Sequence, residues 1–216
     1  YNVEVVYRWN QGDVSSDDMR KNLVPPRESQ VEPFLEMIEK VWMDTYTAEV
    51  GQQTLRSYIP KQLLLVGSAS YNDDGSTTEG TAEGGRQIVL YSVNDFNFEL
   101  EQIQSYAHVM HHEFAHILHQ NVEYDAEFEK ITPSYSSSWM QMNDETARSK
   151  GFITAYASSS ADEDFAEMVS IMLTNSPEDW DNMIENAGNA AAVEALRKKE
   201  AIVVAYMKNN LSLIHI

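Results

Sequence analysis

The sequence has no cysteine among its 216 residues. Without thiols the chain has no disulfides, no thiolate metal ligands and no cysteine nucleophile, so any metal ion must be held by histidine or carboxylate side chains. Basic residues are also few, because 15 Lys and Arg stand against 34 Asp and Glu, which gives a formal net charge of −19. A surface of this charge repels a phosphate backbone, so we expect no nucleic acid among the partners.

Long hydrophobic runs are missing as well. No apolar run approaches the roughly 18 residues of a membrane-spanning helix, so the sequence predicts no transmembrane segment. Apolar residues make up 43% of the chain, which is enough for a packed core. We expect one domain over residues 1–210, with lobes at about 1–121 and 122–210, and a disordered or non-native tail at 211–216. The sequence is also compatible with a signal peptide or lipid anchor upstream of Tyr1.

Hydrophobic periodicity predicts a fold of the α+β class. Short β-rich segments between polar stretches predict strands at Val3–Tyr7, Lys61–Val66 and Arg86–Val93. The stretch 121–138 has weak periodicity, and its last part, residues 132–138, predicts a loop. Apolar residues three and four apart predict helices at Pro33–Ala48, from about Asn94–Asn97 to Gln120, from about Met140, at Ser160–Thr174, from Pro177 to about Gly188 and at Ala190–Lys208.

The most informative segment is His112-Glu113-Phe114-Ala115-His116, an H-E-x-x-H pattern inside the predicted central helix. Residues four apart lie on one face of a helix, so both imidazoles can reach one metal ion. Glu113 cannot share their direction and points toward a water activated by that metal, where a carboxylate can act as general base. The alternative is that the histidines decorate a solvated helix face. The spacing favours a zinc peptidase.

A catalytic zinc site commonly has three protein ligands, and this helix supplies two. His119 lies about 10 Å along the helix axis from His112, too far for one ion at roughly 2 Å from each imidazole. His108 and His111 fail for reach or direction, so these three histidines have structural or surface roles. The metzincin pattern would need a histidine where Val122 stands, so that branch is excluded.

A carboxylate on the predicted helix Ser160–Thr174 remains as the third ligand. Glu163 comes 47 residues after His116, and Glu167 is one turn further along the same helix. Glu163 also fits a capping box, because Ser160 stands three residues before it at the helix start. Both interpretations stay open at this point, and Glu167 is the substitute ligand if Glu163 caps the helix.

At these residues the sequence resembles the gluzincin peptidases. The segment from Tyr156 to Glu167 is similar to the second motif of the lethal-factor and Pro-Pro-endopeptidase group, in which a tyrosine seven residues before the glutamate ligand points into the active site. Residues 95–175 also resemble the zinc-binding metallopeptidases that gut-type bacteria carry as lipoproteins. The resemblance implies a zincin-like α+β fold with a small mixed sheet, an N-terminal helix, a central active-site helix and a mainly helical C-terminal lobe.

The resemblance also implies the site and the activity. One Zn²⁺ would be held by His112, His116 and Glu163, with Glu113 as general base. Tyr156 would donate its hydroxyl to the developing oxyanion, although a plain packed aromatic is the alternative role for this residue. The implied activity is that of a zinc metallopeptidase, an endopeptidase, acting on peptide or protein substrates. The implied location is outside the cytoplasm, as a secreted, periplasmic or surface lipoprotein.

Two further hypotheses compete with the peptidase. The first is a catalytically inactive accessory protein at a bacterial surface that keeps the zincin fold for binding, and the intact Glu113 argues against it. The second is a structural protein without a metal. In zincin folds an edge strand beside the metal helix pairs with the extended substrate, and Arg86–Val93 is the predicted edge strand.

Overall fold

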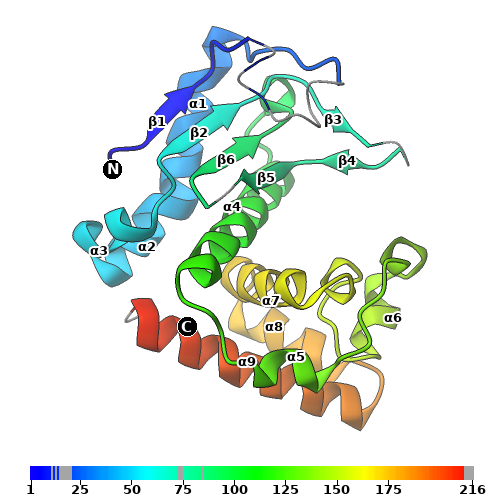
Figure 1. Cartoon of the computed structure of the whole chain (residues 1–216). Helices are drawn as coiled ribbons and strands as arrows, with labels where there is room; N and C mark the ends of the chain where they lie inside the picture. The colour runs from blue at the N-terminus through cyan, green and yellow to red at the C-terminus, as the bar shows by residue number, and fades with distance from the viewer. Residues whose placement is uncertain (11, 13, 15–20, 73–74, 84, 212–216) are drawn as a thin grey trace. The chain divides into compact units, whose positions relative to one another are not determined.

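The structure is a computed structural model that describes residues 1–10, 12, 14, 21–72, 75–83 and 85–211. The chain forms two compact units, Tyr1–Ile117 and Leu118–Ile216, and each is described by itself. A mixed sheet lies in the first unit and the second is helical, which confirms the predicted α+β class (Figure 1). Among the described residues, no helix combines the length and apolarity that a membrane crossing requires. Residues 212–216 of the predicted tail lie outside the described residues.

A four-stranded mixed sheet forms the centre of the first unit. Strands β1, β2 and β6 run parallel, and β5 is antiparallel to β6, in the order β1-β2-β6-β5. A separate two-stranded ribbon pairs β3 with β4. The strands are β1 Glu4–Val6, β2 Gln62–Leu65, β3 Ser70–Tyr71, β4 Thr77–Thr78, β5 Gly80–Glu83 and β6 Gln87–Leu90.

All three predicted strands are confirmed, but the predicted edge position of Arg86–Val93 was wrong. Strand β6, which occupies this segment, pairs with β2 on one side and with β5 on the other. Its backbone hydrogen-bonding groups are therefore taken by the sheet, and an added peptide cannot pair with them. The edge strand next to β6 is β5. Its apolar content is low, so the sequence pattern did not predict this strand.

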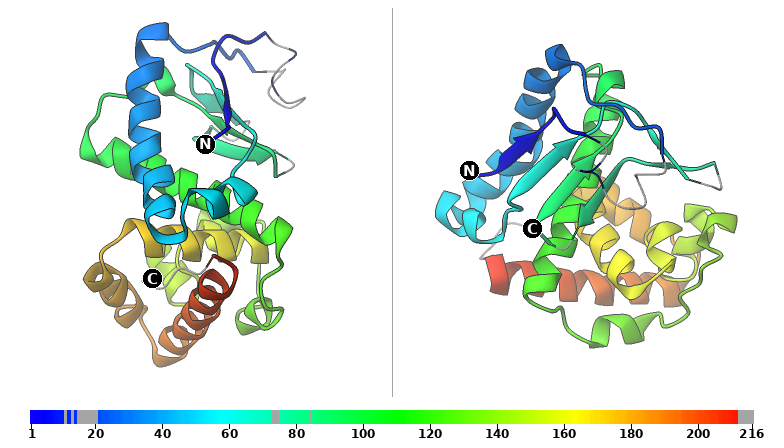
Figure 2. Two further views of the ribbon diagram at one scale, coloured as in Figure 1. Left: turned by 90° about the vertical axis from the view of Figure 1, so that its left-hand side faces the viewer. Right: turned by 45° about the horizontal axis from the view of Figure 1, so that its top comes forward.

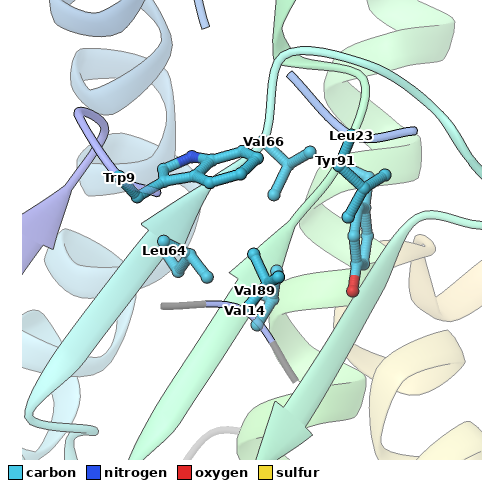
Figure 3. Packing of buried hydrophobic residues seen from close by; sticks show 7 residues of the cluster. All are labelled: Trp9, Val14, Leu23, Leu64, Val66, Val89 and Tyr91. Atoms are coloured by element: carbon cyan, nitrogen blue, oxygen red, sulfur yellow. The ribbon is translucent and has the colours of Figure 1, made fainter. Parts of the chain in front are cut away.

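Both faces of the sheet are buried, which explains the apolar runs in β2 and β6. Leu63 and Leu65 face one side and Leu64 faces the other, and each is at most 1% exposed. On the side of Leu64, residues of the N-terminal segment cover the sheet, and the Trp9 indole donates a hydrogen bond to the Leu65 carbonyl at 2.8 Å. Figure 3 shows this cluster, which consists of Trp9, Val14, Leu23, Leu64, Val66, Val89 and Tyr91.

Helices α1 (Glu28–Ile38) and α4 (Leu100–Asn121) lie on the other face of the sheet (Figure 2). A π-helical turn at Glu39–Met43 joins α1 to α2 (Asp44–Val50), and α3 (Gln52–Tyr58) follows. These elements confirm the helix predicted at Pro33–Ala48, which begins five residues earlier than expected. Pro33 is the sixth residue of α1, past the first four N–H groups that lack helical partners, so α1 forms without the hydrogen bond that a residue at this position would donate to the Ser29 carbonyl.

The central helix begins later than predicted. Val93–Asp95 forms a short 3-10 turn instead of the first turn of α4, and Phe98 has a φ of 63°, in the left-handed region. An α-helix cannot pass through a residue of that conformation, so α4 starts only at Leu100. Its predicted end near Gln120 is confirmed, because α4 ends at Asn121.

The second unit is built from helices and short turns. The Ser160 and Ser176 side chains cap α7 and α8, as the sequence predicted. The stretch 121–138, for which the sequence showed weak periodicity, contains a short helix, α5, before the predicted loop at 132–138, and the helix expected from Met140 is a 3-10 turn followed by α6. The elements are α5 Glu127–Ile131, η5 Trp139–Gln141, α6 Asp144–Arg148, η6 Tyr156–Ser158, α7 Ala161–Thr174, α8 Pro177–Glu185 and α9 Ala190–Leu211.

Candidate metal centre

The rotation of α4 about its axis is fixed by its apolar stripe. Phe114 is fully buried and meets Trp42 and Tyr46 edge-on, with ring centroids 5.3 and 4.9 Å away. Met110 and Ile117, on the same stripe, are also fully buried. Because residues 112 and 116 lie beside this stripe on the helix, the packing that holds Phe114 also fixes the direction of both histidines.

The structure brings His112 and His116 together on one flank of α4. Their Nε2 atoms are 3.1 Å apart, and the rings are nearly perpendicular, at 78°, with centroids 4.8 Å apart. Two imidazole nitrogens bound to a tetrahedral zinc ion at 2.0–2.1 Å would be about 3.3 Å from one another. The observed separation agrees with this value to a few tenths of an ångström, so the pair fits one zinc ion, and its nitrogen donors are of the type that zinc prefers.

Glu113 is the candidate general base. One residue along a helix turns the side-chain direction by about 100°, so this carboxylate cannot be a third ligand on the same flank as His112. Glu113 is 9% exposed, which is rare for a glutamate. A buried carboxylate beside a histidine pair is suited to exchange protons with a water molecule at the metal.

Two of the remaining histidines on α4 have packing roles, as the sequence predicted. His111 is 2% exposed, its Nδ1 lies 3.3 Å from the Tyr46 hydroxyl, and burial lowers its pKa to about 4. His119 packs its ring against Tyr124 and Phe165 within the second unit. His108 is half-buried, with its ring centroid 6.0 Å from that of His112. Its predicted structural role stays a prediction.

Glu163 lies in the first turn of α7 in the second unit. Ser160 has the extended conformation of an N-cap residue, and its Oγ accepts a hydrogen bond from the Glu163 backbone N–H at 3.2 Å. The predicted cap is therefore present, as a hydrogen bond from the backbone N–H of Glu163. The side chain is half-buried. Capping and metal binding are thus compatible roles for this residue.

Glu167, the substitute ligand, is 3% exposed and has a partner within its own unit. Its Oε2 accepts a hydrogen bond from Thr154 Oγ1 at 2.7 Å, and the same hydroxyl oxygen accepts one from the Ala157 N–H at 3.1 Å. Ala157 belongs to the η6 turn that carries Tyr156. Glu167 therefore anchors this turn to α7, a function that sequence reasoning did not assign.

Tyr156 is 37% exposed at the start of η6. Its ring packs against Trp139, with centroids 4.9 Å apart and an interplanar angle of 62°. Both the packed aromatic and the hydroxyl donor remain open, because a ring held by Trp139 can still present its hydroxyl to a substrate. Tyr156 and Glu163 belong to the second unit. That they form one site with His112 and His116 stays a prediction.

A buried ion pair next to Glu163 was missed by the sequence reasoning. Lys199 of α9 and Asp164 of α7 are both 0% exposed, and Nζ lies 2.5 Å from Oδ2. Nζ also donates to the Gly151 carbonyl at 2.7 Å, and Tyr135 donates its hydroxyl to Oδ2 at 3.0 Å. Burial raises the pKa of Asp164 and lowers that of Lys199, and the attraction between the two charges opposes both shifts.

A signal for this pair was present in the sequence. Lys199 stands between Leu196 and Val203 at helical spacing, and both neighbours are buried on the same face of α9. A lysine within the apolar stripe of a helix needs a buried counter-charge, because an unpaired buried ammonium is strongly unfavourable. The spacing could therefore have indicated an internal carboxylate partner, although not which one.

The mixed sheet and the helix with two converging imidazoles define the class of zinc-binding metallopeptidases. A family model described as "Putative zinc-binding metallo-peptidase" matches residues 1–213, and the chain belongs to this family. A solved structure described as a "putative zinc-binding metallo-peptidase" from Bacteroides caccae is 33% identical, with a TM-score of 0.79, and the match covers 99% of this chain and 81% of the other. The comparison with curated proteins gave no match.

Proposed function

We propose that this protein is a zinc metallopeptidase that hydrolyses peptide bonds, with one Zn²⁺ held by His112, His116 and Glu163. The observation that carries the proposal is the 3.1 Å approach of the two Nε2 atoms, which fits a shared zinc ion. Glu163 is favoured as the third ligand because the Glu167 carboxylate accepts a hydrogen bond from Thr154 that anchors the η6 turn, whereas the hydrogen bond from the Glu163 backbone N–H to Ser160 is compatible with metal binding. Membership of the family supports the same activity.

When held by these residues, a zinc ion would lower the pKa of a water molecule and polarise the substrate carbonyl. Glu113 takes a proton from the attacking water as the new C–O bond forms. The same carboxyl group then gives the proton to the leaving amine as the C–N bond breaks, so the carboxylate is regenerated. Tyr156 donates a hydrogen bond to the carbonyl oxygen, where negative charge accumulates in the transition state.

Strand β5 replaces the strand first expected to bind the substrate. It is an edge strand, so its outer backbone groups are able to pair with an extended peptide. Within the first unit, Gly80 of β5 lies directly against Val109, one turn before His112 on α4. A peptide added to β5 would therefore run alongside the part of α4 that carries the histidine pair.

The test of the general base is Glu113→Gln, which preserves the ligands. We expect zinc content to stay near one ion per chain while turnover of a peptide library falls by at least about 100-fold. Glu101→Gln, the same change on the exposed start of α4, is the control and should keep activity. Unchanged turnover in Glu113→Gln would contradict the mechanism. Wild-type protein that binds zinc without hydrolysis would support the inactive accessory protein, and the absence of zinc would support the structural hypothesis.

The third ligand is tested by Glu163→Ala and Glu167→Ala. We expect the first variant to lose zinc affinity by more than about 100-fold, because a direct ligand contributes more than its supporting groups. The second variant should retain zinc, but its melting temperature should fall because the hydrogen bond to Thr154 is lost. If purified Glu163→Ala keeps zinc and Glu167→Ala loses it, the third ligand is Glu167, one helical turn further along α7.

A further inference from the structure

A pocket of about 320 Å³ lies in the second unit, between the η5 turn and α6, and we call it the Trp139 pocket. This volume is at the lower end for ligand sites, so it suits a single side chain or chain end better than a large molecule. The residues around it are Ser136, Ser138, Trp139, Gln141, Met142, Asn143, Thr146 and Lys150.

Two contacts join the Trp139 pocket to Tyr156, the proposed donor to the substrate carbonyl. The Trp139 ring is in edge contact with the Tyr156 ring, at a centroid distance of 4.9 Å. The Ser136 N–H donates to the Ser158 carbonyl at 2.8 Å, which ties the pocket wall to the end of the η6 turn. A group bound in the pocket would therefore belong to a part of the substrate near the carbonyl that Tyr156 would contact.

The chemistry of the Trp139 pocket is that of an anion site. None of its lining residues is acidic, although the chain carries 34 Asp and Glu against 15 Lys and Arg. Asn143 Oδ1 accepts a hydrogen bond from the Thr146 N–H. The side-chain NH₂ group of Asn143 can therefore act as a donor toward the pocket. Serine and threonine hydroxyls and the Gln141 amide are further donors on the wall.

Lys150 supplies the positive charge of the pocket. Its backbone N–H bonds to the Ala147 carbonyl just after α6, which fixes where the side chain begins. In the part of the chain that the structure describes, Lys150 forms no ion pair, whereas Lys130, Lys198 and Lys199 each have a carboxylate partner within 2.8 Å. An ammonium group that has neutral hydrogen-bond donors beside it and no ion pair among the described residues is suited to bind a carboxylate from outside.

We propose that the Trp139 pocket binds a carboxylate group of the peptide substrate, close to the bond that is cut. Lys150 and the Asn143 amide would hold the carboxylate, and the apolar stem of the bound group would pack on Trp139. The inference rests on the proposed function, because it takes Tyr156 as the residue at the reacting carbonyl. The carboxylate can come from an acidic side chain or from the C-terminus of the peptide, and both have the same chemistry.

Binding to zinc-loaded Glu113→Gln protein tests the pocket without turnover. The probes are fluorescent peptides in pairs that differ only by Glu or Gln at one position, each with a free and an amidated C-terminus, at low ionic strength. We expect about 3-fold tighter binding of the carboxylate-bearing member at one position. A preference that persists in amidated peptides identifies a side chain, and a preference for the free terminus identifies the chain end.

Substitutions at Lys150 assign that preference to the pocket. Lys150→Met should abolish it, and Lys150→Glu should reverse it, an overall change of about 10-fold. Lys130→Glu is the matched control, because it makes the same charge change on α5 in the same unit and should leave the preference intact. Thermal unfolding of each variant confirms folding, and Lys150→Met retains the test if Lys150→Glu does not fold.

The outcomes separate the pocket from the peptidase activity. Equal binding within all peptide pairs, or equal effects of Lys150→Glu and Lys130→Glu, would overturn the inference. Hydrolysis of a peptide library by the wild-type protein is scored alongside. Hydrolysis without a carboxylate preference overturns the pocket alone. A Lys150-dependent preference without hydrolysis contradicts the proposed function and supports the pocket.

Discussion

Replacement of Lys199 by methionine should destabilise the second unit strongly. Methionine keeps most of the apolar stem but removes the ammonium group, so the substitution isolates the polar contribution. In the native protein this group contacts Asp164 Oδ2 at 2.5 Å and the Gly151 carbonyl at 2.7 Å, and it lies 4.3 Å from the centroid of the Phe152 ring. After the substitution, Asp164 would keep only Tyr135 as a partner for Oδ2, and its Oδ1 has none among the described residues.

The magnitude follows from the burial of both groups. Removal of one partner from a buried ion pair costs about 3–5 kcal/mol, because the other charge stays buried without compensation. This is a large part of the roughly 5–15 kcal/mol that stabilises a typical domain. For a chain of this length, the melting temperature should fall by about 6–20 °C.

The assay is urea unfolding of metal-free protein, with thermal unfolding as a second measurement. The neighbouring exposed residue gives the matched control, and Lys198→Met should leave the melting temperature close to that of the wild type because its partner Glu194 is also exposed. The double variant Lys199→Met with Asp164→Leu should recover much of the loss, because no charge is then left buried. A loss below about 1 kcal/mol in Lys199→Met, or no recovery in the double variant, would refute the reasoning.

Three further predictions concern packing, pH and metal. Gly80→Ala should destabilise the protein by about 1–3 kcal/mol in urea unfolding, because the new methyl group would overlap the stiff Val109 side chain; failure of Val109→Ala to recover part of this loss would contradict the contact. Burial raises the pKa of Tyr106, so the stability that it contributes is complete below the pH of about 10 at which a free tyrosine ionises, and is lost as the pH rises further. Urea midpoints at pH 9 and 11 should therefore fall more steeply in the wild type than in Tyr106→Phe, and equal slopes would show that Tyr106 does not contribute. Removal of zinc by a chelator should lower the melting temperature, and added zinc should restore it by an amount that grows with the zinc concentration relative to Kd. A melting temperature that does not change with zinc would contradict zinc binding by the folded protein.

Local patterns in the sequence predicted most of the elements. The caps at Ser160 and Ser176 were correct because a cap depends only on residues within one turn of it. The start of α4 was wrong because the left-handed conformation of Phe98 is not encoded by a glycine or asparagine at that position. The edge strand was wrong because the apolar run of β6 reports that the strand is buried on both faces, not which strands pair with it.

The sequence by itself determined the histidine pair, because four residues along a helix return to the same face wherever that helix lies. It also restricted the metal ligands to histidine and carboxylate through the absence of cysteine. Only the tertiary structure decided that β5 is the edge strand, that Lys199 is neutralised by Asp164, and that Trp139 and Lys150 line one pocket beside Tyr156. Each of these joins residues that are separated along the chain, and their meeting depends on how whole elements pack, which no local periodicity encodes.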